Sequence, residues 1–330
     1  MILEFPAVKR VSRATGLRVI NQLGPIVGEA LRRAGGVMVA DASRENAPWE
    51  TRDADILLTG PAKAWRDAPQ TAPHGWPNRV RWVQVASSGV DGFPSWFFDV
   101  PSVTTGRGIT ADPIAEYVLA AILLDAKRLD VLAAHGPEEY RAPDAIAPLG
   151  TLGGKVIGIV GYGAIGQAVA RRAQAFDMDI LAWHRGGSQL PENARRAESL
   201  SALFAQSDIV VLALPLTAET QDIVNAPLLR HAKPGLHLIN VARGGLVDQN
   251  ALLGALDAGQ VRFATLDVTA PEPLPAGHSF YNHPAIRLTP HVSWSDKHGR
   301  ERLAELIVSN LQNLVVGRPL RNLFDRDRGY

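Results

Sequence analysis

Hydrophobic positions in the first third of the chain fall into short runs separated by more polar stretches of helical character. Apolar runs rich in β-forming residues occupy residues 17–21, 36–40, 55–59 and 80–85. Alternation of strands with helices is typical of a parallel sheet covered by helices. We therefore expect the chain to begin with an α/β domain.

The pattern changes near Asp112. The pair Asp112-Pro113 is typical of a helix N-cap followed by proline at the first helical position, and apolar residues then recur at helical spacing as far as about His135. This predicts a helix of about six turns. Residues 137–150 are rich in proline and glycine, which predicts a linker or surface loop.

A second series of strands and helices follows. Its six apolar runs lie at 155–160, 179–183, 208–214, 235–240, 261–268 and 286–289. Six strands with helices between them have the rhythm of a doubly wound dinucleotide-binding domain. One more amphipathic helix follows Pro290, with leucines and isoleucine at helical spacing, and we expect it to pack on the first domain.

Composition narrows the function classes. The 330 residues are 46% hydrophobic and 20% charged, as in soluble globular proteins, and no apolar run approaches the ~20 residues of a membrane-spanning helix. The net charge of +1 gives no reason to expect nucleic acid. The absence of cysteine excludes disulfides and thiolate chemistry, and we expect no metal site. The N-terminal residues lack the order of a secretory signal, so a cytoplasmic protein is expected.

The first chemical motif is a glycine-rich turn, Gly161-Tyr162-Gly163-Ala164-Ile165-Gly166, directly after an apolar strand and opening an amphipathic helix. In this arrangement backbone N–H groups at the helix N-terminus can bind a pyrophosphate, and the glycines let the backbone approach it. The alternative is a tight strand-to-helix turn with no ligand. The surrounding strand pattern favours the dinucleotide.

The next predicted strand ends in LAWHRGG, residues 181–187, about 20 residues past the glycines. NAD enzymes usually carry Asp or Glu there to hydrogen-bond the ribose 2′-hydroxyl. Here the position is His184, followed by Arg185, whose guanidinium suits a 2′-phosphate. We therefore expect NADPH, with Arg185 as the main contact and His184, Gly187 or Ser188 assisting. The alternative is an NAD enzyme with a solvated basic turn.

Three downstream segments place chemistry just beyond strand ends. They are NVARGGLVDQNAL (240–252), LDVTAPEPLP (266–275) and LTPHVSW (288–294). Ligands of open α/β sheets bind at the carboxyl ends of the strands. In motifs, order and spacing the chain resembles the D-isomer-specific 2-hydroxyacid dehydrogenases. The resemblance implies a Rossmann-type nucleotide domain, residues 112–291, inserted into a flavodoxin-like substrate domain, residues 1–111 and 292–330.

The resemblance also implies three catalytic residues whose chemistry fits the role. Arg243 would pair with the carboxylate and carbonyl oxygen of a 2-oxo acid and polarise the C=O bond. His291 would supply the proton that the new alkoxide needs, because imidazole gives and takes a proton around neutrality. Glu272 would hydrogen-bond the imidazole and favour its charged form. Singly, each is better explained as an ordinary surface or loop residue; the three together, in this order, favour the catalytic set.

Other positions match family contacts. Residues 84–93, QVASSGVDGF, match the loop that presents backbone N–H groups to the substrate carboxylate, here Ser88 and Gly89. A looser match is DILLTGP, with Thr59 and Gly60. Asp267 is expected to bond the nicotinamide amide. The matched cofactor contacts are Ala164, Ile165, Leu214, Pro215, Val241, Ala242, Arg243, Asp267 and His291.

Two residues depart from the commoner pattern. Trp294 lies three residues after the histidine, where small residues are frequent, and we expect it to line and reshape the substrate pocket. Arg107 stands where asparagine is common before the long helix; it is either a contact to substrate or phosphate or a solvated loop arginine.

The sequence therefore predicts an NADPH-preferring reductase of small 2-oxo acids, with glyoxylate and hydroxypyruvate as expected substrates and D-2-hydroxy acids as products. The resemblance implies a homodimer, with the helix after Asp112 and the loop before Gly150 at its interface. Two alternatives stay open. One is an enzyme similar to phosphite dehydrogenase, which shares the Arg, Glu and His. The other is a non-catalytic sensor that binds the nucleotide.

Overall fold

The chain divides into two compact units in a computed structural model. One unit runs to Thr110 and resumes over Asp296–Tyr330, and the other comprises Ala111–Ser295. The structure describes residues 16–45, 47–51, 53–130, 132–133, 135–137, 148–185, 190–192 and 194–330. The observed divisions lie one residue from the boundary expected at 111/112 and four residues from that expected at 291/292. Most of the loop expected over 137–150 lies outside the described residues.

The unit that contains Thr110, called unit 1 below, is built on a five-stranded parallel sheet with the order β2-β1-β3-β4-β5. This is the flavodoxin-like order, so the expected topology is confirmed. Its strands are β1 Leu17–Asn21, β2 Val37–Asp41, β3 Ile56–Thr59, β4 Trp82–Val85 and β5 Ser102–Thr104. The sequence did not predict β5, whose three residues are too few to show a period.

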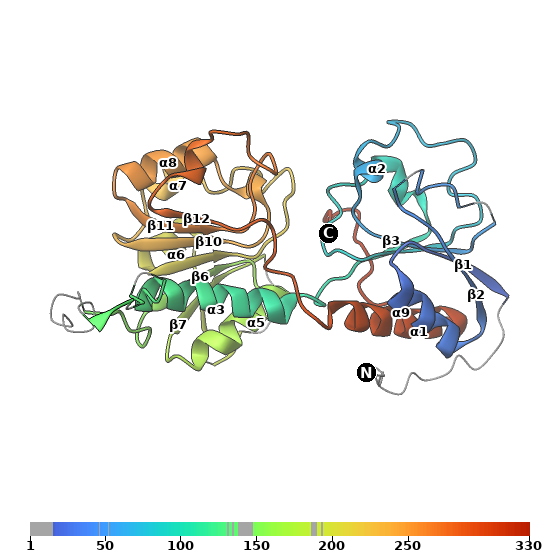
Figure 1. The fold of residues 1–330 in the computed structure, drawn as a ribbon, viewed down its shortest axis with the longest axis horizontal. Coiled ribbons are helices and arrows are strands. Elements are labelled where there is room, and N and C mark those ends of the chain that lie inside the picture. Colours follow the sequence, from blue (N-terminus) through green and yellow to red (C-terminus); the bar gives the residue numbers. More distant parts are fainter. Residues whose placement is uncertain are drawn as a thin grey trace. The chain divides into compact units, whose positions relative to one another are not determined.

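Helices cover both faces of this sheet. On one face, α1 (Pro25–Ala34) and α9 (Gly299–Val315) pack together under the strands, with Leu31, Ile307 and Leu311 almost fully buried (Figure 1). The prediction that the C-terminal helix packs on the first domain is therefore confirmed. On the other face lies α2 (Lys63–Arg66) within a cluster of aromatic side chains that includes Trp65, Trp96 and Phe97.

The second unit, unit 2, is built on a seven-stranded parallel sheet with the order β12-β11-β10-β9-β6-β7-β8. Its strands are β6 Val156–Val160, β7 Asp179–Trp183, β8 Ala194–Arg196, β9 Ile209–Leu212, β10 Leu236–Asn240, β11 Val261–Leu266 and β12 Ile286–Leu288. The strand order reverses between β6 and β9, as in Rossmann-type domains, so the predicted doubly wound fold is confirmed. The sequence did not predict β8, a short polar edge strand.

Helices cover both faces of the second sheet as well (Figure 1). Two helices, α3 (Ala111–Lys127) and α5 (Ala164–Gln174), pack on one face, where Ile122 and Val169 are buried. The other face carries α6 Leu200–Gln206, α7 Ala226–Leu229 and α8 Gln249–Asp257. The strands are apolar on both faces because both faces are covered.

Two expectations about α3 were wrong. The helix starts at Ala111, so Asp112 lies inside its first turn and pairs with Arg172 of α5 at 3.0 Å rather than capping the helix. The helix also ends at Lys127 rather than near His135. Arg128 adopts φ = 52°, in the left-handed region that stops a helix, and Leu129 is 66% exposed, so its apolar character did not signal packing.

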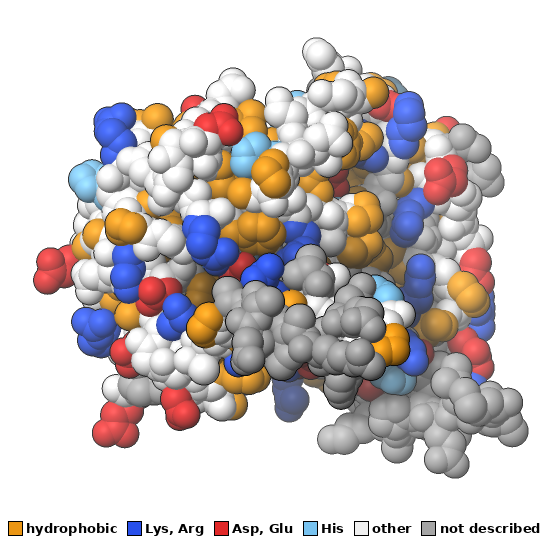
Figure 2. All heavy atoms as spheres, turned by 60° about the vertical axis from the view of Figure 1, so that its left-hand side comes forward, with side chains coloured by type: hydrophobic (Ala, Val, Ile, Leu, Met, Phe, Trp, Pro, Cys, Tyr) orange, Lys and Arg blue, Asp and Glu red, His pale blue; other side chains and the backbone are white. Residues whose placement is uncertain are grey.

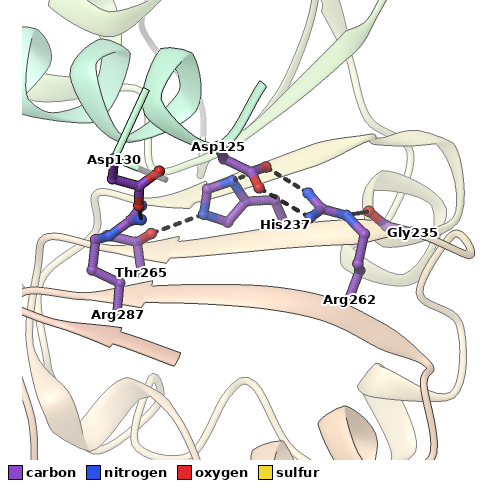
Figure 3. Close-up of polar contacts among 7 residues, drawn as sticks. All are labelled: Asp125, Asp130, Gly235, His237, Arg262, Thr265 and Arg287. Carbon is purple, nitrogen blue, oxygen red and sulfur yellow. Dashed lines mark hydrogen bonds and ion pairs between the residues drawn. The ribbon is translucent and has the colours of Figure 1, made fainter. Parts of the chain in front are cut away.

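A network of charged residues joins the end of α3 to the amino half of the second sheet (Figure 3). Nδ1 of the buried His237 lies 3.2 Å from Oδ2 of Asp125, and its Nε2 lies 2.9 Å from Oγ1 of Thr265. Arg262 donates to both carboxylate oxygens of Asp125, at 3.0 and 2.5 Å. The pairing of β10 with β11 shifts by one residue here, which leaves Arg262 as the extra residue of a bulge.

The surface carries both signs of charge. On the face shown in Figure 2, Lys and Arg side chains occur in separate spots among acidic and apolar side chains. Among the described residues, no helix combines the length and the apolar character needed to cross a membrane.

Candidate active site

The glycine-rich turn lies where the strand order of the second sheet reverses. Gly161 follows β6 with φ = 99°, and a Cβ there would lie 2.6 Å from Ala213 O, so only glycine fits. A Cβ on Gly166 would lie 2.2 Å from Gly161 O, which explains the third glycine of the motif. At Gly163 a Cβ would meet nothing within 4 Å, so the space beside the turn is open.

The helix after this turn can bind an anion. It begins at Ala164 with Gly163 as N-cap and without a side-chain cap. Within the described part of the chain, no residue accepts a hydrogen bond from the backbone N–H groups of Ala164 or Ile165. Open N–H groups at the positive end of a helix dipole favour a phosphate, so this turn fits the pyrophosphate of a dinucleotide. Tyr162 would offer only its backbone to such a ligand, because its ring is buried in the core below α5.

The position that would select the cofactor holds two cations and one acid. Arg185 pairs with Glu219 at 2.6 Å, and both side chains are largely exposed. The sequence shows no carboxylate after β7, but the fold brings Glu219 there from the loop after β9. Arg196 of β8 donates to His184 O at 2.9 Å, so a second cation lies at this strand end. Gly187 and Ser188 lie outside the described residues.

A clamp fixes the turn that carries Arg243, directly after β10. The buried Asn240 accepts from Ala242 N at 3.1 Å and donates to Arg243 O at 2.8 Å. A Cβ on Gly244 would lie 2.0 Å from the carbonyl carbon of Thr269, so the backbones after β10 and β11 lie in contact. Arg243, half-buried, is thereby fixed beside the loop that leads to the predicted Glu272.

Glu272 and His291 contact each other as expected. Nδ1 of His291 lies 2.7 Å from Oε1 of Glu272, and the two side chains are 36% and 43% exposed. A carboxylate that accepts from Nδ1 fixes the orientation of the ring and stabilises the imidazolium form. Among the described residues, none hydrogen-bonds Nε2 of His291, which leaves that nitrogen available to a substrate.

Asp267 organises the backbone around His291. Its carboxylate accepts from the Thr289 hydroxyl at 2.6 Å and from the Val292 and Ser293 N–H groups, each at 2.9 Å. The Asp267 carbonyl also accepts from His291 N at 2.9 Å. His291 has φ = 52°, a conformation that costs free energy and that these bonds stabilise. Asp267 is 1% exposed, and its carboxylate forms these three hydrogen bonds with its own chain. Its expected bond to the nicotinamide amide stays a prediction.

In unit 1, the loop after β4 has the expected open N–H groups. Ser87 Oγ donates to Gly89 O at 2.6 Å and Gly106 N donates to Ser87 O at 2.9 Å, which fixes the turn. No described residue accepts from the N–H groups of Ser88 or Gly89. The looser candidate Thr59 is fully buried and its hydroxyl bonds Gln22 and Trp65, so its side chain has no free hydrogen for a ligand.

The remaining predicted contacts lie at the carboxyl ends of strands in unit 2. Leu214, Val241 and Ala242 are buried and Pro215 is half-buried, so any contact they make involves mainly their backbone. Trp294 is 51% exposed, and its Nε1 donates to His291 O at 2.7 Å. Sequence reasoning missed this bond, as well as the parts played by Asn240 and Glu219, because each depends on backbone geometry or on a distant segment.

Comparison with known proteins agrees with this geometry. The family model "D-isomer specific 2-hydroxyacid dehydrogenase, NAD binding domain" matches residues 126–293. The hydroxypyruvate reductase of Blautia hydrogenotrophica is 32% identical over 285 residues, which cover 81% of this chain and 84% of that protein. The glyoxylate reductase of Thermococcus kodakarensis is 40% identical over 218 residues, which cover 63% and 65%.

A solved structure extends the likeness to the fold. The D-isomer specific 2-hydroxyacid dehydrogenase of Xanthobacter autotrophicus, in complex with NADPH and MES, is 29% identical and superimposes with a TM-score of 0.77, covering 96% of this chain and 100% of that one. The family model, the relatives and the shared fold all indicate an oxidoreductase with a nicotinamide cofactor. The chain belongs to the D-isomer-specific 2-hydroxyacid dehydrogenase family.

Proposed function

We propose that this protein is an NADPH-preferring reductase that converts small 2-oxo acids, of which glyoxylate and hydroxypyruvate are the leading examples, to D-2-hydroxy acids. The observation that carries the proposal is the 2.7 Å contact of His291 with Glu272, on the same sheet as an uncapped glycine-rich turn. The relatives of this chain that are named glyoxylate reductase and hydroxypyruvate reductase support small 2-oxo acids as the substrate class. We propose that the protein acts in the cytoplasm as a homodimer.

The chain's own residues would perform the proton chemistry. With Glu272 accepting from Nδ1, the imidazolium of His291 presents an Nε2–H to the carbonyl oxygen of the substrate. Giving that proton to the new alkoxide leaves the neutral ring with Nε2 as an acceptor, ready for the reverse reaction. Arg243 would hold the substrate carboxylate and polarise the carbonyl group. The bound reduced nicotinamide supplies the hydride.

The preference for NADPH rests on Arg185 and Arg196 beside His184. An exposed ion pair such as Arg185–Glu219 contributes at most about 1 kcal/mol, so a 2′-phosphate can displace the carboxylate at little cost. The phosphate carries more charge than the carboxylate and offers three acceptor oxygens. The Xanthobacter relative, which binds NADPH, supports the same preference.

The test is steady-state reduction of glyoxylate and hydroxypyruvate with NADPH and NADH in parallel, with chiral analysis of the product. We expect kcat/KM to be higher with NADPH and the product to be the D isomer. Arg185→Gln should raise KM for NADPH about 10- to 100-fold and leave KM for NADH nearly unchanged. Glu219→Gln should lower KM for NADPH a few-fold, because it removes the competing carboxylate.

Arg230→Gln is the matched control. Arg230 is an exposed arginine at the end of α7, before β10 and therefore at the opposite edge of the sheet from the glycine-rich turn. It should change neither KM. Equal or better efficiency with NADH would overturn the cofactor preference, and an L product would overturn the stereochemical part of the proposal.

A further inference from the structure

One arginine of unit 1 reaches across the end of a strand. Arg44 follows β2, yet its Nη1 lies 3.4 Å from the point that a Cβ would occupy on Gly60, the residue after β3. Ala86, after β4, and Leu23, after β1, lie 3.3 and 3.5 Å from the same point. Since β1 lies between β2 and β3, the guanidinium extends over the end of β1.

This place is the reversal point of the sheet. In the order β2-β1-β3-β4-β5 the direction of winding changes between β1 and β3, and ligands of such folds bind outside the carboxyl ends of the strands at that point. The absence of a side chain on Gly60 leaves room for the guanidinium. Arg44 therefore lies where a ligand of unit 1 would bind.

Among the described residues, no carboxylate pairs with the guanidinium of Arg44. Other arginines of the unit pair with carboxylates, as Arg18 does with Asp53 and Arg79 with Asp55. The half-buried Arg44 forms no hydrogen bond or ion pair with any residue that the structure describes. Asp41, the last residue of β2, is engaged by Arg32 and Asn21. A partly desolvated cation without a counter-charge favours binding of an anion.

A second anion-binding feature lies next to it. The open N–H groups of Ser88 and Gly89 lie two and three residues after Ala86 in the chain, and the Cβ of Ala86 shares the neighbourhood of Gly60 with Arg44. The family resemblance implies that these N–H groups bind the carboxylate of the 2-oxo acid, in addition to the role proposed for Arg243. The guanidinium is then left for a different anionic group of the same molecule.

We propose that Arg44 is a specificity-determining residue, and that the preferred substrates are 2-oxo acids with a second anionic group, a carboxylate or a phosphate, at the far end. The inference rests on the proposed reduction of 2-oxo acids, and it ranks members with a second anionic group above glyoxylate and hydroxypyruvate. An arginine binds either group in bidentate fashion, so the experiment must separate the two.

The experiment compares chain-matched pairs of substrates. Each of 2-oxoglutarate and 2-oxoadipate is assayed against the monoacid of equal length, 2-oxovalerate and 2-oxohexanoate, and 3-phosphohydroxypyruvate is assayed against hydroxypyruvate. We expect kcat/KM to favour at least one anionic member over its partner about tenfold or more, mainly through KM. The member that is favoured identifies the group as a carboxylate or a phosphate.

Variants test the residue itself. Arg44→Gln should lower the ratio of kcat/KM within the favoured pair about tenfold or more, and Arg44→Lys should restore part of it. A purely structural role would lower both members of the pair alike and leave the ratio unchanged. Arg81→Gln is the matched control, because Arg81 is exposed and precedes β4, at the opposite edge of the sheet.

The outcomes separate this inference from the proposed function. If the protein reduces glyoxylate or hydroxypyruvate but favours no anionic member of any pair, the inference is overturned and the proposed function stands. An unchanged ratio in Arg44→Gln also overturns it. If no 2-oxo acid is reduced with either nicotinamide, the proposed function falls and the inference falls with it.

Discussion

Two histidine–carboxylate pairs lie at opposite edges of the seven-stranded sheet. At the amino edge, His237 on β10 is 1% exposed and its partner Asp125 is 17% exposed. Past the carboxyl edge, His291 is 36% exposed and its partner Glu272 is 43% exposed. The chemical groups are the same, but their surroundings differ.

The two histidines differ in whether a ring nitrogen remains available to a ligand. Both ring nitrogens of His237 face partners within the chain, Asp125 and Thr265, and Arg262 neutralises the carboxylate (Figure 3). Nε2 of His291 has no such partner among the described residues. A histidine–carboxylate pair is therefore no sign of catalysis by itself; an open nitrogen at the carboxyl edge of a parallel sheet is the informative feature.

The largest expected effect comes from replacing each histidine in turn. His291→Ala should lower kcat about 10²- to 10⁴-fold, the usual contribution of a general acid, with little change in NADPH affinity. His237→Gln should leave kcat within about twofold and lower the melting temperature, because it disrupts a buried polar network. Turnover with saturating substrate, titration with NADPH and thermal unfolding would measure the three quantities. Normal turnover in His291→Ala would remove the distinction between the two pairs.

Substitutions of two glycines test whether activity depends on the tight backbone contact between Gly244 and Thr269. Gly244→Ala would place a Cβ 2.0 Å from the Thr269 backbone, which cannot move aside as a side chain can. We expect kcat/KM to fall about 10- to 100-fold as Arg243 is displaced, with a loss of stability of about 1–3 kcal/mol.

Gly254→Ala is the matched control for this displacement. A Cβ on Gly254, an exposed residue of α8, would meet nothing within 4 Å. Alanine is the better helix former, so this variant should gain about 0.5–1 kcal/mol and retain full activity. Activity assays and chemical unfolding of both variants would measure the contrast. Equal activity in the two would show that the backbone contact at Gly244 is dispensable.

The same contrast shows why the sequence predicted one edge well and the other poorly. The residues of the carboxyl edge follow apolar strands within short motifs, so Arg243, Glu272 and His291 could be placed at strand ends from the sequence, and the family resemblance then suggested their roles. The amino-edge network joins Asp125 to Arg262, 137 residues apart, through a bulge that no period reveals. Asp125 was counted only as part of a longer helix.

The prediction of secondary structure failed where the local sequence signals were weak. The strand β8 is Ala194–Arg196, three half-exposed or exposed residues that pair with a single neighbour, β7, and show no apolar alternation. Glu219 escaped notice because it reaches Arg185 only through the fold. Propensity and pattern describe segments, whereas these features arise from the way that distant segments pack.

The smallest expected effect concerns the pH dependence of stability at the amino edge. Burial lowers the pKa of His237 from its ordinary value of 6.5, and the Asp125 carboxylate only partly opposes this. The unfolded chain therefore takes up a proton near pH 6.5 that the folded chain does not. Stability should fall as the pH drops below about 7, by at most about 1.4 kcal/mol per pH unit for this one group.

The neighbouring carboxylate acts in a separate pH range. Burial alone would raise the pKa of Asp125, but the close contact with His237 and the hydrogen bonds from Arg262 outweigh it and hold the pKa well below its usual range. Its contribution is therefore present above about pH 4 and is lost only in stronger acid. Unfolding between about pH 7.5 and 5 isolates the histidine.

His237→Gln, which cannot titrate, should flatten the decline in unfolding midpoint over that interval. The control is His231→Gln, because His231 is exposed in the same unit and its side chain forms no hydrogen bond, ion pair or ring contact with the described residues. It should leave the slope as in the unmodified chain. If His237→Gln keeps the full slope, the decline belongs to other groups and the amino-edge histidine is not held neutral.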